Sequence, residues 1–189
     1  MAGAEKKASR ERRTLIFIDE SGFYLLPGLV RTYGPKGETP ILEEWHSKDH
    51  LSVMSGITPR GHLFTRVRKT AVHSPDCVTF LKHVERQLGS KVLAIWDRSP
   101  IHRGREVKAY LAQDGRRRIH LELLPGYAPE LNPDEGVWQH LKHVELRNVC
   151  ALDLEELTYH LHNAIVRMRR QPLLIQSFFA GAKLDIAKL

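Results

Sequence analysis

Two short apolar runs constrain the fold of this chain more than any other feature. The first, LIFI, covers residues 15–18, and the second, KVLAIW, covers residues 91–96. Continuous apolar runs of this length are typical of strands that are buried on both faces of a sheet, as in α/β proteins. Each run stops at an aspartate, Asp19 after the first and Asp97 after the second. The pattern predicts two central strands that each end in a carboxylate.

Hairpin and helix patterns surround these two strands. Residues 51–67 alternate loosely on both sides of a TPRG turn, which predicts a β-hairpin. Apolar spacing predicts helices over residues 74–89 and 103–113, and the run IHLELL at residues 119–124 predicts a third buried strand. A last long helix is expected to begin after Asp153, which is a favoured capping residue. Helices that alternate with apolar strands predict an α/β fold with βαβ crossovers.

Composition narrows the class of protein. The chain has 189 residues, 42% of them hydrophobic and 27% charged, which suits one soluble globular domain, and its formal net charge of +7 favours an anionic partner. Residues 1–13 carry five basic and two acidic side chains, and we expect a basic disordered tail there, followed by one domain over residues 14–189. Residues 29–33 and 40–45 are weaker candidates, for either strands or loops.

Neither export nor membrane insertion is expected. The apolar run after the tail is far too short for a signal peptide, and nothing approaches transmembrane length. Cys77 and Cys150 lie far apart in no metal or redox spacing. We therefore expect reduced thiols in a cytoplasmic protein.

The stretch PGYAPELNPDEGVWQHLK, residues 125–142, predicts a helix with a clearly marked start. Asn132 is a favoured N-cap residue, and Pro133 suits the first helical position. Glu135 then falls in the first turn, where it can be read either as a capping-box residue or as a functional carboxylate. The helical wheel places Val137, Leu141 and Val144 on one side and Glu135, Gln139 and Lys142 on another.

Together, three carboxylates indicate a metal site. If the strands that end at Asp19 and Asp97 are neighbours, their carboxyl ends meet at one edge of the sheet, and the helix of Glu135 can add a third ligand. Such oxygen donors suit Mg²⁺ or Mn²⁺. Each aspartate taken singly is also explained as an ordinary strand-end residue. Glu20 and Asp134, which neighbour the candidates, remain alternative ligands.

These residues lie in motifs that resemble the Asp-Asp-Glu (DDE) transposases of bacterial insertion sequences, in the branch related to mariner elements. Thirty-seven residues separate Asp97 from Glu135, which suits that branch. The resemblance implies a ribonuclease H-like fold, with a mixed five-stranded sheet flanked by helices. The matching segments are FIDESGF, RTYGPKGETP, HLSVMSGITPRGHLF, IWDRSPIHR and PGYAPELNPDEGVWQHLK.

The resemblance also implies an activity and a set of site residues. It carries the family's catalytic metal ligands onto Asp19, Asp97 and Glu135, which would hold two Mg²⁺ or Mn²⁺ ions for DNA strand cleavage and strand transfer at transposon ends. His102 matches a family position that orients a ligand or the scissile phosphate, with a structural hydrogen-bonding role as its alternative, and Glu20 is a further auxiliary candidate. Basic residues expected to contact DNA are Arg98, Arg103, Arg105, Arg116, Arg117, Arg118 and Lys142.

Partners follow from the same resemblance. Transposases of this kind carry helix-turn-helix modules before the catalytic domain, whereas only a short basic tail precedes the first strand here. We therefore expect a separate helix-turn-helix subunit or reading frame, transposon ends and target DNA as ligands, and a homodimer supported by the apolar segment 173–179. Two other functions stay open, which are a ribonuclease H-like nuclease without strand transfer and an inactive DNA-binding remnant.

Overall fold

A computed structural model describes residues 2–25, 36, 49–113, 115–126 and 128–185 of the chain. The weak strand candidates at residues 29–33 and 40–45 lie outside these ranges. None of the helices in the described part combines the length and the apolar character that a membrane crossing requires.

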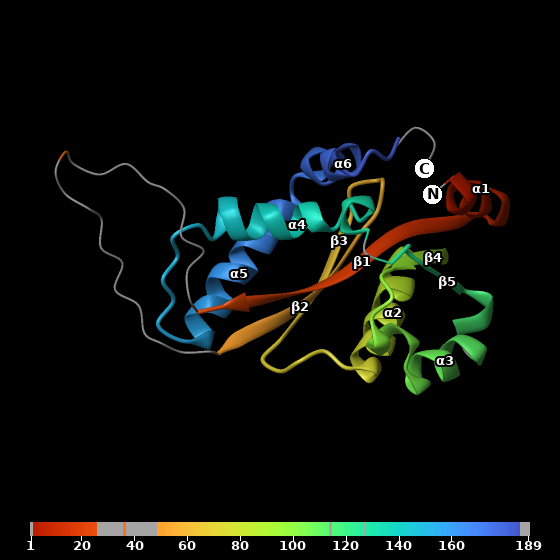
Figure 1. Ribbon diagram of the computed structural model, residues 1–189, viewed down its shortest axis with the longest axis horizontal. Helices are drawn as coiled ribbons and strands as arrows, with labels where there is room; N and C mark the ends of the chain where they lie inside the picture. The colour runs from red at the N-terminus through yellow and green to blue at the C-terminus, as the bar shows by residue number, and fades with distance from the viewer. Residues whose placement is uncertain (1, 26–35, 37–48, 114, 127, 186–189) are drawn as a thin grey trace.

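A mixed five-stranded sheet forms the centre of the molecule (Figure 1). Strands β1, β4 and β5 run parallel, whereas β2 runs antiparallel to both β1 and β3. The predicted hairpin, the two apolar strands and the strand at residues 119–124 are all present. The order across the sheet is β3-β2-β1-β4-β5, with β1 at Arg13–Tyr24, β2 at His50–Ile57, β3 at Leu63–Arg68, β4 at Lys91–Trp96 and β5 at Ile119–Leu123.

Strand β1 is longer than its apolar run predicts. It pairs with β4 only as far as Phe17, opposite Ile95, and then continues along β2 to Tyr24. The expectation that this strand ends at Asp19 is therefore wrong, because the alternating residues of β2 provide a partner for the polar continuation. Asp19 lies at the point where β1 loses its parallel neighbour.

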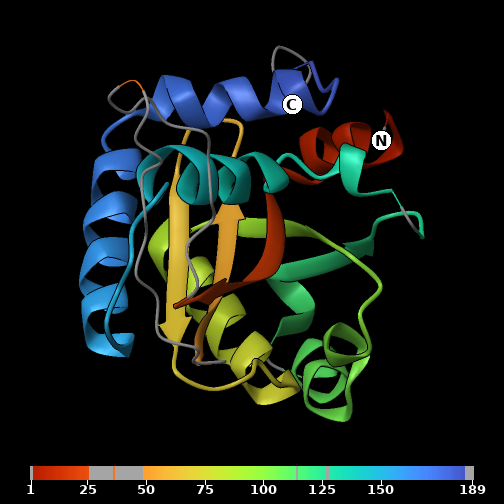
Figure 2. The same ribbon diagram turned by 60° about the vertical axis from the view of Figure 1, so that its left-hand side comes forward.

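Helices cover both faces of the sheet (Figures 1 and 2). Alternate residues of β1 separate two hydrophobic cores: Leu15 and Phe17 face one group of helices, while Ile16 and Ile18 face the other. Phe17 packs edge-on against Phe179, with ring centroids 5.6 Å apart. The first group is α4 (Glu135–His140), α5 (Leu154–Arg169) and α6 (Pro172–Gly181), and the second is α2 (Ser74–Leu88) and α3 (Arg105–Ala112).

Local capping chemistry sets the ends of the two longest helices. Asp153 accepts hydrogen bonds from the N–H groups of Glu155 and Glu156, both at 2.8 Å, and so begins α5 as expected. Gly89 ends α2 in the left-handed conformation, with φ of 62°. The N-cap of α2 is His73, and the Asp76 carboxylate accepts from its backbone N–H at 3.0 Å.

The helix after Asn132 differs from its prediction at its far end. Val137 and Leu141 are fully buried, but Val144 is 56% exposed. The chain changes from α4 into a π-helical turn, η4 (Leu141–Glu145), which has more residues per turn than an α-helix. The helical wheel that places Val144 with Val137 and Leu141 therefore no longer applies there.

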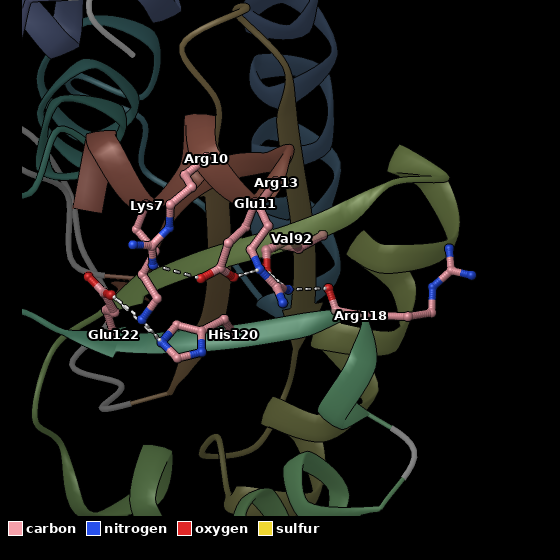
Figure 3. Close-up of polar contacts among 8 residues, drawn as sticks. All are labelled: Lys7, Arg10, Glu11, Arg13, Val92, Arg118, His120 and Glu122. Atoms are coloured by element: carbon pink, nitrogen blue, oxygen red, sulfur yellow. Dashed lines mark hydrogen bonds and ion pairs between the residues drawn. The ribbon is translucent and has the colours of Figure 1, made fainter. Parts of the chain in front are cut away.

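Residues 2–11 form helix α1 (Ala2–Glu11) where the basic composition predicts a disordered tail. Figure 3 shows how its end docks on the edge of the sheet. Lys7 Nζ lies 2.9 Å from a Glu122 carboxylate oxygen in β5, and Arg13 Nε donates to Glu11 at 2.6 Å. Arg13 also donates to the backbone carbonyls of Val92 and Arg118. Glu122 and the carbonyls of Val92 and Arg118 lie far along the chain from this helix, so composition alone cannot indicate these contacts. The division into a tail and one domain over residues 14–189 stays a prediction.

Candidate active site

Sheet topology brings the two predicted aspartates together. Strands β1 and β4 are parallel neighbours, and Phe17 pairs with Ile95, so Asp19, two residues further along β1, lies beside Asp97, which directly follows β4. Glu135 begins α4, which crosses above this edge of the sheet. All three side chains line one cleft of about 450 Å³, together with Arg98, Ser99, Asn132 and residues of the 124–129 segment.

Burial and hydrogen bonding act on Asp19 in opposite directions. Burial raises the pKa of Asp19 to about 7, while a hydrogen bond from Trp138 lowers it, and the charges of Glu20 and Glu135 raise it further. The indole Nε1–H of Trp138 donates to Asp19 Oδ2 at 3.0 Å. Desolvation therefore dominates, and ionised Asp19 needs a cation to offset its burial.

A hydrogen-bonded chain behind the cleft holds Asp97. Its Oδ1 accepts from the Ser99 N–H at 2.8 Å and lies 2.6 Å from His102 Nδ1. The hydrogen bond from His102 is the main reason why the pKa of Asp97 lies below its usual value. Because both contacts go to Oδ1, they leave Oδ2 for a ligand in the cleft.

The other nitrogen of His102 reaches Glu20. Nε2 lies 2.9 Å from Glu20 Oε2, and Glu20 Oε1 accepts from the indole of Trp96 at 3.1 Å. The imidazole is buried and stacks on Trp96 with ring centroids 4.0 Å apart. Burial disfavours its charge, but the hydrogen bonds to Asp97 and Glu20 outweigh burial and raise the pKa of His102 to about 9.

Glu135 is positioned by the turn that precedes α4. Asn132 Oδ1 accepts from the Asp134 N–H at 3.2 Å, and the Glu135 N–H donates to the Asn132 carbonyl at 3.1 Å. The helix begins at Glu135 with Asp134 as its N-cap, two residues later than predicted. The Asn132 N–H donates to the Pro129 carbonyl, so it does not need a capping-box carboxylate. Glu135 instead lines the cleft.

Asp134, an alternative ligand from the sequence, is buried and is not among the residues that line the cleft. Ser55 in β2 donates to its Oδ1 at 2.8 Å, while Oδ2 has no hydrogen-bond partner. Burial raises the pKa of Asp134 well above its usual value. The contact with Ser55 ties the start of α4 to the sheet beside Asp19. Sequence reasoning missed both Ser55 and the bond from Trp138, although Trp138 stands three residues after Glu135 in the recognised motif.

The predicted DNA-binding residues divide into two groups. Arg98 lines the cleft, with Nε donating to the Leu124 carbonyl at 2.8 Å. Lys142 lies nearby and donates to Ser21 Oγ at 2.7 Å. Burial lowers the pKa of Lys142, while the negative charges of Glu135 and Asp19 raise it by a smaller amount. Arg103 donates to the Arg98 carbonyl, and Arg105 is exposed.

The remaining arginines lie at the opposite edge of the sheet, where β5 begins. Arg118 pairs there with Glu85 at 2.6 Å, and Arg117 is exposed. The side chain of Arg116 lies outside the described part of the structure. The structure therefore brings Arg98 and Lys142 toward the three carboxylates, but it does not bring Arg117 or Arg118 there.

The donor set of the cleft fits a hard divalent cation. Its three acidic side chains offer only oxygen ligands, which is the chemistry that Mg²⁺ and Mn²⁺ prefer. Burial is the main cause of the raised pKa of Asp19, and the charges of Glu20 and Glu135 add to it, as expected for carboxylates that share one site. The assignment of these residues as metal ligands stays a prediction.

A mixed five-stranded sheet with helices on both faces, and with carboxylates where two parallel strands part, defines a ribonuclease H-like fold. The chain belongs to the DDE superfamily of endonucleases, whose family model matches residues 14–158. No match is found among curated proteins.

Solved structures of the Mos1 mariner transposase share this fold. The Mos1 paired-end complex with Mn has a TM-score of 0.66 at 13% identity, covering 95% of this chain and 59% of that one. The paired-end complex with Mg has a TM-score of 0.65 at 17% identity, covering 97% and 59%. The separate Mos1 catalytic domain has a TM-score of 0.57 at 13% identity, covering 97% and 92%. The chain thus spans about 60% of the longer Mos1 chains and nearly all of the catalytic domain.

Proposed function

We propose that this chain is the catalytic domain of an insertion-sequence transposase, which cuts DNA strands at transposon ends and joins the freed 3′ ends to target DNA. One observation carries the proposal: Asp19, Asp97 and Glu135 come from three separate elements and line a single cleft. Membership of the DDE endonucleases and the fold shared with Mos1, which was solved in paired-end complexes with Mn and with Mg, support it.

The cofactor belongs to the proposal. Asp19, Asp97 and Glu135 would hold two Mg²⁺ or Mn²⁺ ions, with Oδ2 of Asp97 left free for this purpose. Such ions, when bound, supply Lewis-acid activation of the attacking oxygen and stabilise the leaving oxygen. Trp138 fixes the rotamer of Asp19, and the pair of His102 and Glu20 fixes that of Asp97, so that both carboxylates are oriented before DNA arrives.

The nucleic acid would be held by cations at the rim of the cleft. Arg98 and Lys142 lie beside the carboxylates, where each can neutralise a phosphate next to the scissile bond. A homodimer and a separate helix-turn-helix partner that reads transposon ends remain parts of the same proposal.

Strand transfer from pre-cleaved transposon ends in Mn²⁺ tests the proposal. Glu135→Gln keeps the size of the side chain but removes its charge, and we expect activity to fall on the order of 10³-fold. Glu130→Gln is the matched control, because Glu130 is exposed and lies outside the cleft lining. Asp97→Asn is expected to match Glu135→Gln.

Three results would contradict the proposal. Equal activity of Glu135→Gln and Glu130→Gln would show that the carboxylate of Glu135 is not needed for the reaction. Nicking without joined products would favour a ribonuclease H-like nuclease. DNA binding that depends on salt, but neither on metal nor on Asp97, would favour an inactive DNA-binding protein.

A further inference from the structure

A second group of metal-ligating side chains lies behind the candidate active site, on the face of the sheet covered by α2 and α3. Glu20 comes from β1, Cys77 from the first turn of α2, and His102 from the short 3₁₀ helix η1 (Pro100–Arg103). One donor atom of each residue lies within 4.8 Å of the other two, and no other such group of three occurs in the part of the chain that the structure describes. Three elements thus bring three donor types to one place.

These donors are buried and their orientations are set by neighbouring groups. The side chain of His102 is fully buried, Cys77 is buried, and Glu20 is 18% exposed. Asp97 holds His102 through Nδ1 and thereby turns Nε2 toward Glu20. The Trp96 indole donates to Glu20 Oε1, which leaves the other oxygen, Oε2, facing His102 Nε2 at 2.9 Å. A carboxylate on the far nitrogen of a histidine is the usual support of a metal-bound imidazole.

The mixture of sulfur, nitrogen and oxygen selects a different metal from that of the carboxylate cleft. Thiolate and imidazole favour Zn²⁺ and disfavour Mg²⁺. Tetrahedral zinc with bonds of about 2.0–2.3 Å needs donors roughly 3.4–3.8 Å apart. The Cys77 sulfur lies within 4.8 Å of both partners, and His102 Nε2 and Glu20 Oε2, which lie 2.9 Å apart, would move apart when the ion enters between them.

We propose that Glu20, Cys77 and His102 form a zinc site, with water in the fourth position. Binding displaces the thiol proton of Cys77 and the Nε2 proton of His102 to solvent, while His102 keeps its Nδ1 proton, which it donates to Asp97 Oδ1. Zinc would replace the direct contact between His102 Nε2 and Glu20. Because His102 also donates to Asp97 through Nδ1, the bound ion would affect the charge of the ring that Asp97 contacts. The site stands on its own side chains and does not depend on the proposed strand transfer.

Cobalt titration of the metal-stripped protein tests this site. One Co²⁺ per chain should give a thiolate-to-cobalt charge-transfer absorption band, which Zn²⁺ removes and excess Mg²⁺ leaves in place. Cys77→Ser should abolish the band and weaken Zn²⁺ binding on the order of 10²-fold or more. Cys150→Ser, at the other free cysteine, is the matched control and should keep both.

Several outcomes would overturn the zinc site. They are no band in the wild-type protein, a band that persists in Cys77→Ser, and a band that is lost in Cys150→Ser. His102→Asn gives a second test that does not alter the thiol, and circular dichroism melting confirms that each variant folds. Glu135→Gln should keep the band while losing Mn²⁺-dependent strand transfer, so a failure of one proposal is distinguishable from a failure of the other.

Discussion

At the scale of single residues, burial of Asp19 disfavours its ionised form, which a bound cation would favour. The residue before Asp19 on β1, Ile18, is fully buried, and the indole of Trp138 donates a hydrogen bond to Asp19 Oδ2. Burial prevails over that hydrogen bond and raises the pKa of Asp19 to about 7. The folded protein therefore binds a proton at Asp19 that the unfolded chain, with an ordinary carboxyl pKa of 3.8, has released.

This difference predicts how stability changes with pH in the absence of metal. Because the folded pKa is the higher one, stability falls as pH rises from 3.8 to about 7, by on the order of 4 kcal/mol from this group alone. Asp19→Asn cannot ionise, so it should lose most of this dependence and be more stable than the wild type above neutral pH. Urea unfolding at about pH 5 and about pH 8 measures the difference.

The comparison of the two proteins isolates Asp19 from other titrating groups. The raised pKa of His102, about 9, also makes stability fall as pH rises toward that value, but it does so in both proteins. If the free energy of unfolding depends on pH in the same way for wild type and Asp19→Asn, then burial does not raise the pKa of Asp19.

At the scale of elements, the position of Glu135 depends on how closely α4 packs on α6. Gly136 follows Glu135, and a Cβ atom there would lie 2.6 Å from Cγ of Phe178. No real side chain tolerates such a contact, so α4 approaches α6 this closely only because residue 136 is glycine. The close approach and the bond between Ser55 and Asp134 fix the helix from two sides.

Gly136→Ala should therefore move α4 as well as destabilise the protein. Overpacking of this kind costs about 1–3 kcal/mol, and a displacement of about 1 Å at Glu135 is expected to reduce strand transfer on the order of 10²-fold. Chemical denaturation and the strand-transfer assay measure the two effects.

Gly181→Ala is the control on the partner helix, since nothing lies within 4 Å of a Cβ at Gly181. It should leave activity unchanged and alter stability by less than about 1 kcal/mol. If Gly136→Ala behaves in the same way, the packing of α4 on α6 does not set the position of Glu135.

At the scale of the whole molecule, the sheet separates two hydrophobic cores and places the carboxylates at its edge. Asp19 and Asp97 belong to strands that hold both cores together, while Glu135 belongs to a helix on one face only. A cation that binds all three would link the helical layer to the sheet. Metal binding is therefore expected to stabilise the fold as one unit.

Thermal melting in Mn²⁺ measures this linkage. At a hundred times the dissociation constant, binding to the folded state adds about 2.7 kcal/mol, which corresponds to a rise in melting temperature on the order of 5–10 °C for a domain of this size. Asp19→Ala should abolish the rise, whereas Glu130→Gln should retain it. A wild-type melting temperature that does not change in millimolar Mn²⁺ would argue against the three-carboxylate metal site.

Much of the fold was predictable because it depends on local physics. The apolar runs of β1 and β4, the hairpin of β2 and β3, the glycine that ends α2 and the aspartate that begins α5 each act within a few residues. Asp19, Asp97 and Glu135 were candidates for a related reason, since Asp19 and Asp97 directly follow apolar runs and Glu135 follows marked helix-start residues. Residues 15–18 alone, however, gave no sign that β1 continues along β2 to Tyr24.

The amino-acid sequence by itself determined the order of strands β1 to β5 and helices α2 to α5, the acidic residue that follows each of the first two apolar runs, and the family resemblance of its motifs. Only the tertiary structure decided that Trp138 reaches Asp19 across 119 residues, that Ser55 holds Asp134, and that Cys77 meets Glu20 and His102. It also decided that residues 2–11 form a docked helix. The physical reason is that periodicity and capping act between near neighbours, whereas these contacts join positions far apart along the chain and leave no repeating pattern in it.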